Sequence, residues 1–472
     1  MTASEPPLLL NATRDLARFA ADLTFEQIPA EVIEHLKLSI LDSIGVCLHG
    51  VTLPWTRHVQ ALVEAEESRG EASIFGSGKK TSAANAVLVN STAGHAFELD
   101  DIHKESIIHP GSLAFPVALA LAEAKGEAGS DTSGRDLITA IVAGYEVGAR
   151  IGNAATVQLL LDGFHPQGTS GAFVAAATAA RILGLDAHHT LHCLGIVGSQ
   201  AGGLMAAQEG AMVKRFHSGR AAQSGIYSAL LAQRGFTGVE DVLEAAYGGY
   251  LATHSGAPAP EKLTAGLGST WEIQNVGYKP YAAVTSIHTA LDTLLQIMRE
   301  HDLSADDIAT VDAAVSQATY VHCAWEYKAQ GLTAAQMNLY FGLALIAIDG
   351  NAFVEQYRED RLQDPKVLDF IGRVSARVDP EIEAMGAAFR HAARIAVTTR
   401  DGRTLKAEKL NRRGSAENPL TPDDIERKFR DVVRSCLAAD AIDRLVVLAQ
   451  ELETRDSLGE LIQIMGAPTA RH

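Results

Sequence analysis

The sequence is poor in cysteine. Four are present among 472 residues, none belongs to a CxxC pair, and they stand far apart: Cys47, Cys193, Cys323 and Cys436. Disulfide frameworks and zinc ribbons need closely spaced cysteines, so both are excluded. We expect four free, buried thiols in a reducing compartment, which predicts a cytoplasmic protein.

Positive charge and long apolar runs are also scarce. Forty Lys and Arg stand against fifty-seven Asp and Glu, which gives a formal net charge of −17. Such an acidic chain lacks the positive potential that nucleic acids and anionic membranes require. The apolar run 341–348 is far shorter than the roughly 20 residues that span a bilayer, and residues 1–15 show no secretory signal. We therefore expect no nucleic-acid partner and no membrane.

Short motifs of common cofactor sites are missing as well. Neither GxGxxG nor GxSxG occurs, and GSGKKTS at 76–82 lacks the spacing of a phosphate loop. His188, His189, His192 and Cys193 give helical i, i+4 pairs that could hold zinc, but their segment has the pattern of an ordinary amphipathic helix. We expect neither a metal nor an organic cofactor.

Small residues with helical spacing are abundant. Apolar positions recur at helical intervals over the first 265 residues, as in Leu16, Phe19 and Leu23. Alanine-rich segments such as AFVAAATAARILGL let helices approach closely, so we expect a tightly packed helical body. Helical signals return at Thr421-Pro422, where acidic residues follow a good helix start.

The segment between these helical parts has a mixed pattern. A Gly/Pro/Ser-rich loop at 253–270 precedes it. The run ATVDAAVS alternates as a half-buried strand does, and Asp401-Gly402 joins two strand-like runs as a hairpin turn. We predict a mainly α protein, in which residues 1–275 and 413–472 form a large all-helical domain and residues 276–412 form a smaller, inserted α+β lid domain.

Two similar segments are candidates for chemistry. Residues 94–124 and 163–182 each place a His-Pro pair in a polar loop before an apolar helix. Proline keeps the preceding residue out of the helical region, so His109 and His165 should lie in extended loops. Helix starts favour carboxylates, and a histidine there can move a proton near neutral pH. The alternative is that each histidine only caps its loop.

Charged residues accompany both segments. Glu98, Asp100 and Asp101 precede the first histidine, and they are either general bases, orienting groups or a solvated acidic turn. The segment GAMVKRFHSGRAAQSG, residues 210–225, concentrates positive charge in an acidic chain. A partly buried Lys214 there could bind a substrate carboxylate or, once deprotonated, act as a base. A basic surface turn is the alternative.

Together these segments resemble the MmgE/PrpD family, which includes 2-methylcitrate dehydratase, cis-aconitate decarboxylase and iminodisuccinate epimerase. The resemblance covers nearly the whole chain and is carried by LDSIGVCLHG (41–50), AANAVLVNSTAGHAFELDD (83–101), HPGS (109–112), GFHPQGTSG (163–171), VKRFHSGRAAQSG (213–225), YKPYAAVTSIH (278–288) and NPLTPDDIERKF (418–429). It implies a helical domain made of both termini, an α+β lid, a homodimer and a cleft between the domains. It implies no metal and no organic cofactor.

The resemblance also implies the site residues. His109, His165 and Lys214 match active-site positions of the family, and Asp100 and Asp101 match its DD pair, so we expect these five to be catalytic. Substrate-binding residues are expected in the same segments and in the lid, namely Glu98, Lys104, Ser112, Thr169, Lys279, Tyr281 and His288.

Three positions depart from the family's decarboxylase-like pattern. Glu98 stands in place of an Asp, Ile102 in place of a Thr and Val284 in place of a His, while His288 is kept. Two polar positions have thus become apolar. This favours a smaller, less charged or differently shaped substrate than cis-aconitate or methylcitrate.

We therefore predict a cofactor-free lyase that removes a proton α to a carboxylate of a small di- or tricarboxylate and eliminates water. Preorganised cations and N–H donors would stabilise the charge that builds on the carboxylate. Epimerisation by the same proton abstraction, decarboxylation and non-catalytic carboxylate binding are the alternatives. The roles of base and acid among His109, His165 and Lys214 stay open.

Overall fold

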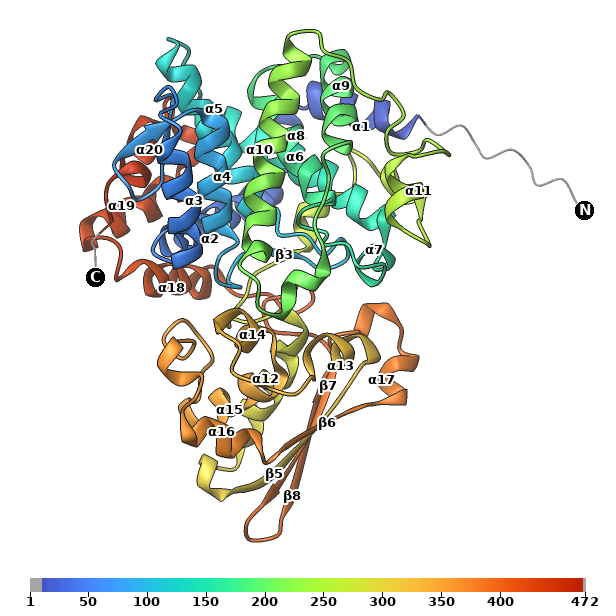
Figure 1. Cartoon of the computed structure of the whole chain (residues 1–472), viewed down its shortest axis with the longest axis vertical. Coiled ribbons are helices and arrows are strands. Elements are labelled where there is room, and N and C mark those ends of the chain that lie inside the picture. Colours follow the sequence, from blue (N-terminus) through green and yellow to red (C-terminus); the bar gives the residue numbers. More distant parts are fainter. Residues whose placement is uncertain (1–10, 470–472) are drawn as a thin grey trace, which may run out of the picture.

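The computed structural model describes residues 11–469 and is mainly helical, with small sheets. Figure 1 shows two lobes, one built of helices and one that carries the largest sheet. The prediction of a mainly α protein is confirmed. The predicted absence of a secretory signal depends in part on residues 1–10, which lie outside the described residues.

Helices from both ends of the chain make up the first lobe, here called the helical lobe. From the N-terminal side it contains α1 (Ala12–Asp22), α2 (Ala30–Gly50), α3 (Pro54–Ala65), α4 (Ala83–Gly94), α5 (Gly111–Glu127), α6 (Gly134–Ala155), α7 (Gln158–Leu161), α8 (Ser170–Ile182), α9 (Ala187–Gly198), α10 (Val213–Gln233) and α11 (Tyr250–His254). The chain returns to this lobe with α18 (Pro422–Val433), α19 (Ala439–Gln450) and α20 (Gly459–Gly466). Helix α18 packs against α2. The domain boundaries at residues 276 and 412 stay a prediction.

Small residues fill the centre of the helical lobe. Helix α8 is buried along nearly its whole length and packs against α6. A Cβ atom added at Gly144 of α6 would lie 2.0 Å from Oγ1 of Thr178, so glycine is needed for this close approach. The short hairpin of β1 (Ala72–Ile74) and β2 (Lys79–Thr81) lies against α4.

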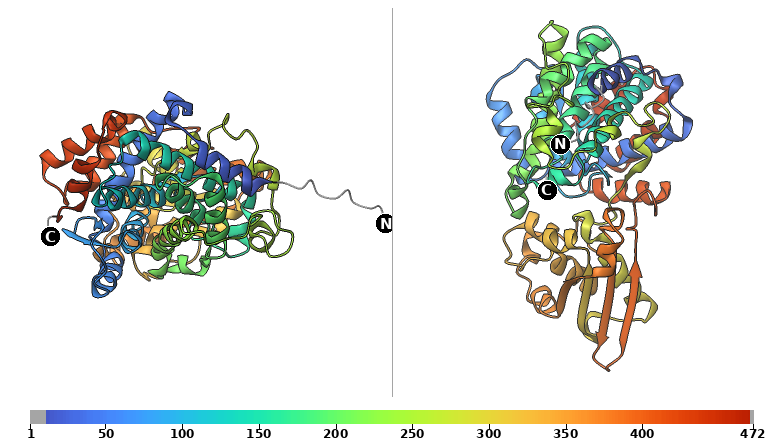
Figure 2. Two further views of the ribbon diagram at one scale, coloured as in Figure 1. Left: turned by 90° about the horizontal axis from the view of Figure 1, so that it is seen from above. Right: turned by 90° about the vertical axis from the view of Figure 1, so that its right-hand side faces the viewer.

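The second lobe, here called the sheet lobe, combines helices with a four-stranded sheet. Its elements are α12 (Thr285–Glu300), β5 (Ile308–Val315), α13 (Gln317–Cys323), α14 (Leu332–Met337), α15 (Leu339–Asp349), α16 (Pro365–Ile371), β6 (Val374–Val378), α17 (Pro380–Ala384), β7 (Ala393–Thr399) and β8 (Thr404–Lys409). The strand order is β6-β5-β7-β8, in which β5 and β6 are parallel and the other pairs are antiparallel. Helix α12 packs on β7 and β8, and the sheet extends away from the helical lobe (Figure 2).

Local signals in the sheet lobe agree with the structure. The run ATVDAAVS coincides with β5 and its neighbouring residue, and the turn at Asp401-Gly402 joins β7 to β8. Gly402 has a φ of +91°, a conformation that favours glycine. Strand β3 (Ile102–His103) pairs antiparallel with β4 (Val276–Gly277), where the chain leaves the helical lobe.

Two predictions made from scarce features can be compared with the fold. All four cysteines are free and buried, as predicted. Among residues 11–469, no single helix has the length and apolar character needed to cross a bilayer, and the bent pair of α2 and α3 reaches that threshold only when the two are taken together.

Candidate active site

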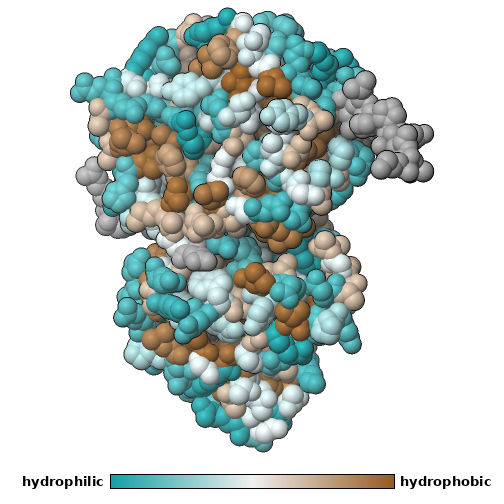
Figure 3. All heavy atoms as spheres, turned by 45° about the vertical axis from the view of Figure 1, so that its right-hand side comes forward, coloured by the Kyte–Doolittle hydropathy of each residue, from teal (hydrophilic) through white to brown (hydrophobic). Residues whose placement is uncertain are grey.

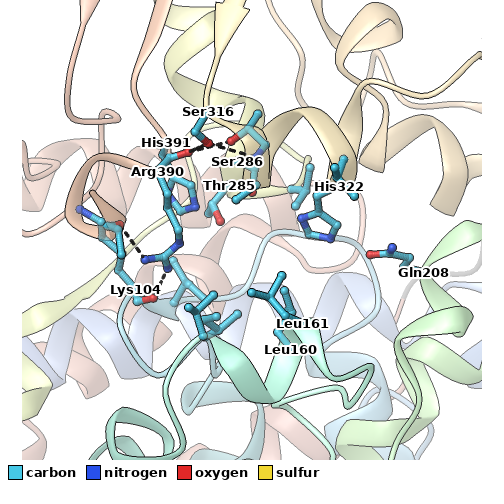
Figure 4. Close-up of a pocket in the computed structure, with 18 of the residues that line it drawn as sticks. Lys104, Leu160, Leu161, Gln208, Thr285, Ser286, Ser316, His322, Arg390 and His391 are labelled. Carbon is cyan, nitrogen blue, oxygen red and sulfur yellow. Dashed lines mark hydrogen bonds between the residues drawn. The ribbon is translucent and has the colours of Figure 1, made fainter. Parts of the chain in front are cut away.

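A cavity of about 590 Å³ lies between the two lobes. In the space-filling view the molecule narrows between the lobes (Figure 3). Six predicted site residues line the cavity: Glu98, Lys104, His109, His165, Lys214 and Lys279. Part of its wall comes from the sheet lobe, with Thr285, Ser286, Ser316, His322 and Arg390 labelled in Figure 4. Neither lobe alone forms this cavity.

The loop before α5 is held by Asp101. Its carboxylate accepts hydrogen bonds from the Gly111 backbone N–H at 3.0 and 3.2 Å and from the Tyr145 hydroxyl at 2.7 Å. This places the carboxylate at the N-terminus of α5, where the helix dipole favours it. Burial raises the pKa of Asp101 to about 8. Asp101 therefore fixes the loop and does not line the cavity.

Glu98 is the centre of a buried ion cluster. It pairs with Lys214, with Arg215 Nη1 at 2.6 Å and with Lys279 Nζ at 3.0 Å. Although burial opposes ionisation, Lys214, Lys279 and Arg215 hold the pKa of Glu98 well below its ordinary value. Burial in turn lowers the pKa of Lys214 to about 8, against the opposing effect of Glu98. The cluster delivers two lysine ammonium groups to the cavity wall.

The backbone around the cavity is strained at two residues. Glu98 has a φ of +54° and Ile107 a φ of +57°, and both line the cavity. The left-handed region is rarely adopted by a β-branched residue such as Ile107, so surrounding contacts must hold it there. The Ile107 N–H donates to the carbonyl of His103 at 2.9 Å, which closes the loop.

His109 is oriented through one ring nitrogen. Its Nδ1 donates to the backbone carbonyl of Asp101 at 2.7 Å and lies 3.4 Å from Oδ1 of Asp100. This hydrogen bond assigns the proton to Nδ1 and leaves the Nε2 lone pair free. Burial lowers the pKa of His109 to about 3, although Asp100 opposes the shift. A neutral imidazole of this kind can accept a proton at Nε2.

Asp100 links two histidines. Its Oδ2 lies 2.7 Å from Nδ1 of His95, and its other oxygen faces His109. Burial would raise the pKa of Asp100, but His109, His95 and Lys279 hold it below its ordinary value. One ligand atom each from His95, Asp100 and His109 lie within 4.8 Å of one another, a spacing a metal ion could use. His95 and Asp100 are hydrogen-bonded to each other in this structure, and the absence of a metal stays a prediction.

His165 faces this group from the other side. Its ring centroid lies 5.7 Å from that of His95, and its Nδ1 lies 2.9 Å from Nδ1 of His217, so one of these two rings donates and the other accepts. Burial and nearby Lys214 hold the pKa of His165 well below its ordinary value. Two neutral imidazoles therefore line one cavity beside a lysine.

Four of the predicted substrate-binding residues are not part of the cavity lining, and their contact with substrate stays a prediction. Ser112 donates to the carbonyl of His109 at 2.9 Å, and Thr169 donates to the carbonyl of His165 at 3.1 Å. Tyr281 donates to Asp292 at 2.7 Å, and Nε2 of His288 donates to the carbonyl of Ala283 at 2.9 Å. All four side chains donate to oxygen atoms of the protein. Each thereby pairs a buried backbone or carboxylate oxygen that would otherwise lack a hydrogen bond.

Other cavity residues were missed by the sequence interpretation. The sheet lobe contributes His322, Arg390, His391 and Arg412, and buried His95 supports His109 through Asp100. His95 lies in segment 83–101, which carries the family resemblance, so that segment could have indicated it as a site residue. Arg390 and His391 lie in a loop without a motif, so the sequence offered no signal for them. All three departures line the cavity, and the two apolar ones, Ile102 and Val284, make its wall more apolar.

Comparison with known proteins covers nearly the whole chain. The family pattern described as the MmgE/PrpD N-terminal domain matches residues 14–262, and the MmgE/PrpD C-terminal domain matches residues 281–454. A cis-aconitate decarboxylase-like protein, oryM, of Aspergillus oryzae is 31% identical over 98% of this chain and 99% of its own length. The cis-aconitate decarboxylase of Aspergillus terreus is 30% identical over 97% and 96%, and that of Homo sapiens 26% identical over 98% and 96%.

Proposed function

Because the chain belongs to the MmgE/PrpD family, we propose that it is a lyase acting on a small polycarboxylate, with loss of carbon dioxide as its reaction. The observation that supports this most is the convergence of His109, His165 and Lys214 on one cavity between the lobes. The names of the relatives favour decarboxylation over the elimination of water that the sequence favoured.

The chemistry of the step matches these groups. Breaking the bond to a carboxylate leaves an electron pair on carbon, which a neighbouring unsaturated carboxylate can take up as negative charge. The ammonium groups of Lys214 and Lys279 are placed to stabilise that charge before it forms. A proton must then reach carbon. Burial keeps His109 and His165 neutral, so the Lys214 ammonium, with a pKa of about 8, can supply this proton directly or through one of the two histidines. The assignment between the two histidines stays open.

An apolar wall stands beside the cations. Leu160, Leu161, Met205, Val284 and Met337 line the same cavity. A carboxylate held against such a wall loses the water that stabilises its negative charge. Carbon dioxide is neutral, so the loss of water costs it far less. Removing water from the leaving carboxylate therefore favours its departure.

Elimination of water is the second candidate, and one observation favours it. His109 keeps its Nε2 lone pair free in the cavity because Nδ1 donates to Asp101. A general base for abstraction of a proton α to a carboxylate needs this state. Epimerisation would use the same abstraction, and a non-catalytic carboxylate binder would use the cavity without turnover.

We propose that the reaction needs no metal and no organic cofactor, since histidine and lysine supply the proton transfer and charge stabilisation. We also propose that the protein is cytoplasmic, with a small polycarboxylate as its partner and no nucleic acid or membrane. These proposals depend on the acidic composition and the scattered, free cysteines.

Proton NMR of the full-length protein in D2O tests the reaction. The panel contains cis-aconitate, citrate, methylcitrate, malate and tartrate. We expect a product that has lost one carboxylate and gained one deuterium at carbon. A vinyl signal with all carboxylates retained would establish elimination instead, and exchange of an α-proton without a new product would establish epimerisation.

Matched lysine variants separate the site from the fold. Lys214→Met should lower turnover at least about a hundredfold, because the developing charge loses its ammonium partner. Lys262→Met, at an exposed lysine paired with Glu105, should leave turnover unchanged. Equal turnover of a folded Lys214→Met variant and the wild type would contradict the proposed site.

A further inference from the structure

Two arginines, Arg390 and Arg412, line the sheet-lobe side of the cavity. Arg390 donates to the backbone carbonyls of Lys104 and Ala387, and Arg412 donates to the carbonyl of Tyr278 at 3.3 Å. Neither forms an ion pair with any Asp or Glu side chain that the structure describes. Both line the cavity, and Figure 4 shows Arg390 reaching toward Lys104.

Other buried cations of this protein are paired. Arg215 bonds Glu98 at 2.6 Å, and Lys428 lies 2.6 Å from Asp42. A buried charge without a counter-ion is costly, and proteins retain such groups where a ligand supplies the missing charge. Arg412 is 2% exposed, so solvent does not supply that compensation.

The surroundings of the two arginines also point to an anion. His391 lines the same wall, is 8% exposed, and its Nδ1 has no hydrogen-bond partner among the described residues. Ser316 and Thr319 donate to the backbone carbonyl of Arg390 at 2.6 and 2.8 Å, which fixes the start of its side chain.

Nearby carboxylates act on this wall only from a distance: Glu417 and Glu105 act on Arg390, and Glu417 and Asp292 act on Arg412, without an ion pair to either arginine. Lys104 takes up Glu417 at 2.9 Å, and Glu383, which lines the cavity, accepts from the Gln317 N–H at 2.9 Å. Burial lowers the pKa of Arg390 and of Arg412 to about 10, so both stay charged at neutral pH.

We propose that Arg390 and Arg412, with His391, form a carboxylate subsite that holds a non-reacting carboxylate of the substrate. This inference rests on the proposed function and adds the residues that hold the second carboxylate. The reacting carbon then faces His109, His165 and Lys214 on the helical lobe, while the far carboxylate is held from the sheet lobe. Arginine suits the second task because its planar fork binds carboxylates with two parallel hydrogen bonds.

Calorimetric titration with an unreactive probe tests the subsite without turnover. The probe is propane-1,2,3-tricarboxylate, and the proteins are the full-length wild type, Arg390→Gln, Arg390→Lys and the matched control Arg394→Gln. Arg394 lies on β7 and pairs with Asp379, Glu381 and Glu408 outside the cavity lining. We expect Arg390→Gln to weaken binding at least about tenfold, Arg390→Lys to weaken it less, and Arg394→Gln to leave it unchanged.

The outcomes separate the subsite from the proposed function. Equal binding by wild type and Arg390→Gln, with the fold verified by circular dichroism, overturns the subsite and leaves the lyase proposal standing. No binding of any polycarboxylate by the wild type overturns the proposed function itself. Tight binding of inorganic phosphate that depends on Arg390, without binding of the tricarboxylate, assigns the subsite to phosphate and overturns its role for a carboxylate. Arg412→Gln provides a second variant with the same expected loss.

Discussion

Glu98 combines a strained backbone with ion pairs that offset the cost of the strain. Its left-handed backbone, with a φ of +54°, costs on the order of 1–3 kcal/mol. The three cations that surround its carboxylate compensate for that strain and keep the group ionised. Because its charge is already taken up by Lys214, Arg215 and Lys279, Glu98 is better suited to positioning these cations than to binding an anionic substrate. We therefore infer that it acts through Lys214.

The titration of Lys214 predicts a pH profile. A lysine is charged below its pKa, and burial places that of Lys214 at about 8. If its ammonium stabilises the developing charge, kcat/KM should be steady near neutral pH and fall as the pH rises through about 8. Steady-state kinetics between pH 6 and pH 10 would measure this.

A variant identifies the group behind the falling limb, since the pKa of Asp101 is also about 8. Lys214→Arg keeps its charge over the whole range, so its profile should lose the decline even at lower absolute activity. A decline that persists in Lys214→Arg would assign it to Asp101. A wild-type rate that instead increases through pH 8 would make neutral Lys214 the base.

At the scale of elements, local signals were sufficient for much of the fold. The turn at Asp401-Gly402 and the helix start at Thr421-Pro422 depend on residues next to each other in sequence, and both are present. The site was predicted only where motifs carry it, as at His109 and Lys214. Arg390 could not be predicted, because it reaches the cavity through the packing of two lobes.

Side-chain direction limited the prediction in a second way. Tyr281 and His288 stand in a segment that contributes to the site, and the prediction that they bind substrate followed from that. The fold of residues 278–288 turns both side chains to protein partners, whereas Lys279 faces Glu98. Sequence proximity to a site does not determine which face of a segment reaches it.

The contact between α6 and α8 predicts a cost for an added methyl group. An alanine Cβ at Gly148 would lie 2.1 Å from Cγ2 of Val174. Alanine gains about 1 kcal/mol of helix propensity over glycine, but overpacking costs about 1–3 kcal/mol. We expect Gly148→Ala to lower the thermal midpoint, measured by circular dichroism.

Gly126→Ala is the matched control on α5. The nearest atom to its added Cβ is Oδ1 of Asp131 at 4.0 Å, so we expect no loss of stability there. If Gly148→Ala were as stable as Gly126→Ala, the close approach of α6 and α8 would not be needed for the fold.

At the scale of the whole molecule, charge is distributed unevenly. The chain carries a net charge of −17, yet Lys104, Lys214, Lys279, Arg390 and Arg412 line one cavity. Cations are thus gathered where a polycarboxylate would bind. Because the two lobes share these groups, the relative position of the lobes decides whether all of them reach one ligand at once.

Exposed apolar side chains on and after α10 are where we expect the contact of a homodimer. Tyr227 and Leu231 lie one turn apart on α10 and are 43% and 37% exposed, and Phe236 and Val239 follow with 58% and 46% exposure. Large apolar side chains exposed within one short segment are typical of a surface covered by a partner. We expect a second copy to cover it, so light scattering should give twice the chain mass of 50.1 kDa.

Leu231→Glu should shift the protein toward the monomer, because a charge would be buried in the interface, while Leu62→Glu, at an exposed position on α3, should not. A wild type that stays monomeric at all concentrations would contradict the homodimer, and a dimer unaffected by Leu231→Glu would place the interface on another surface.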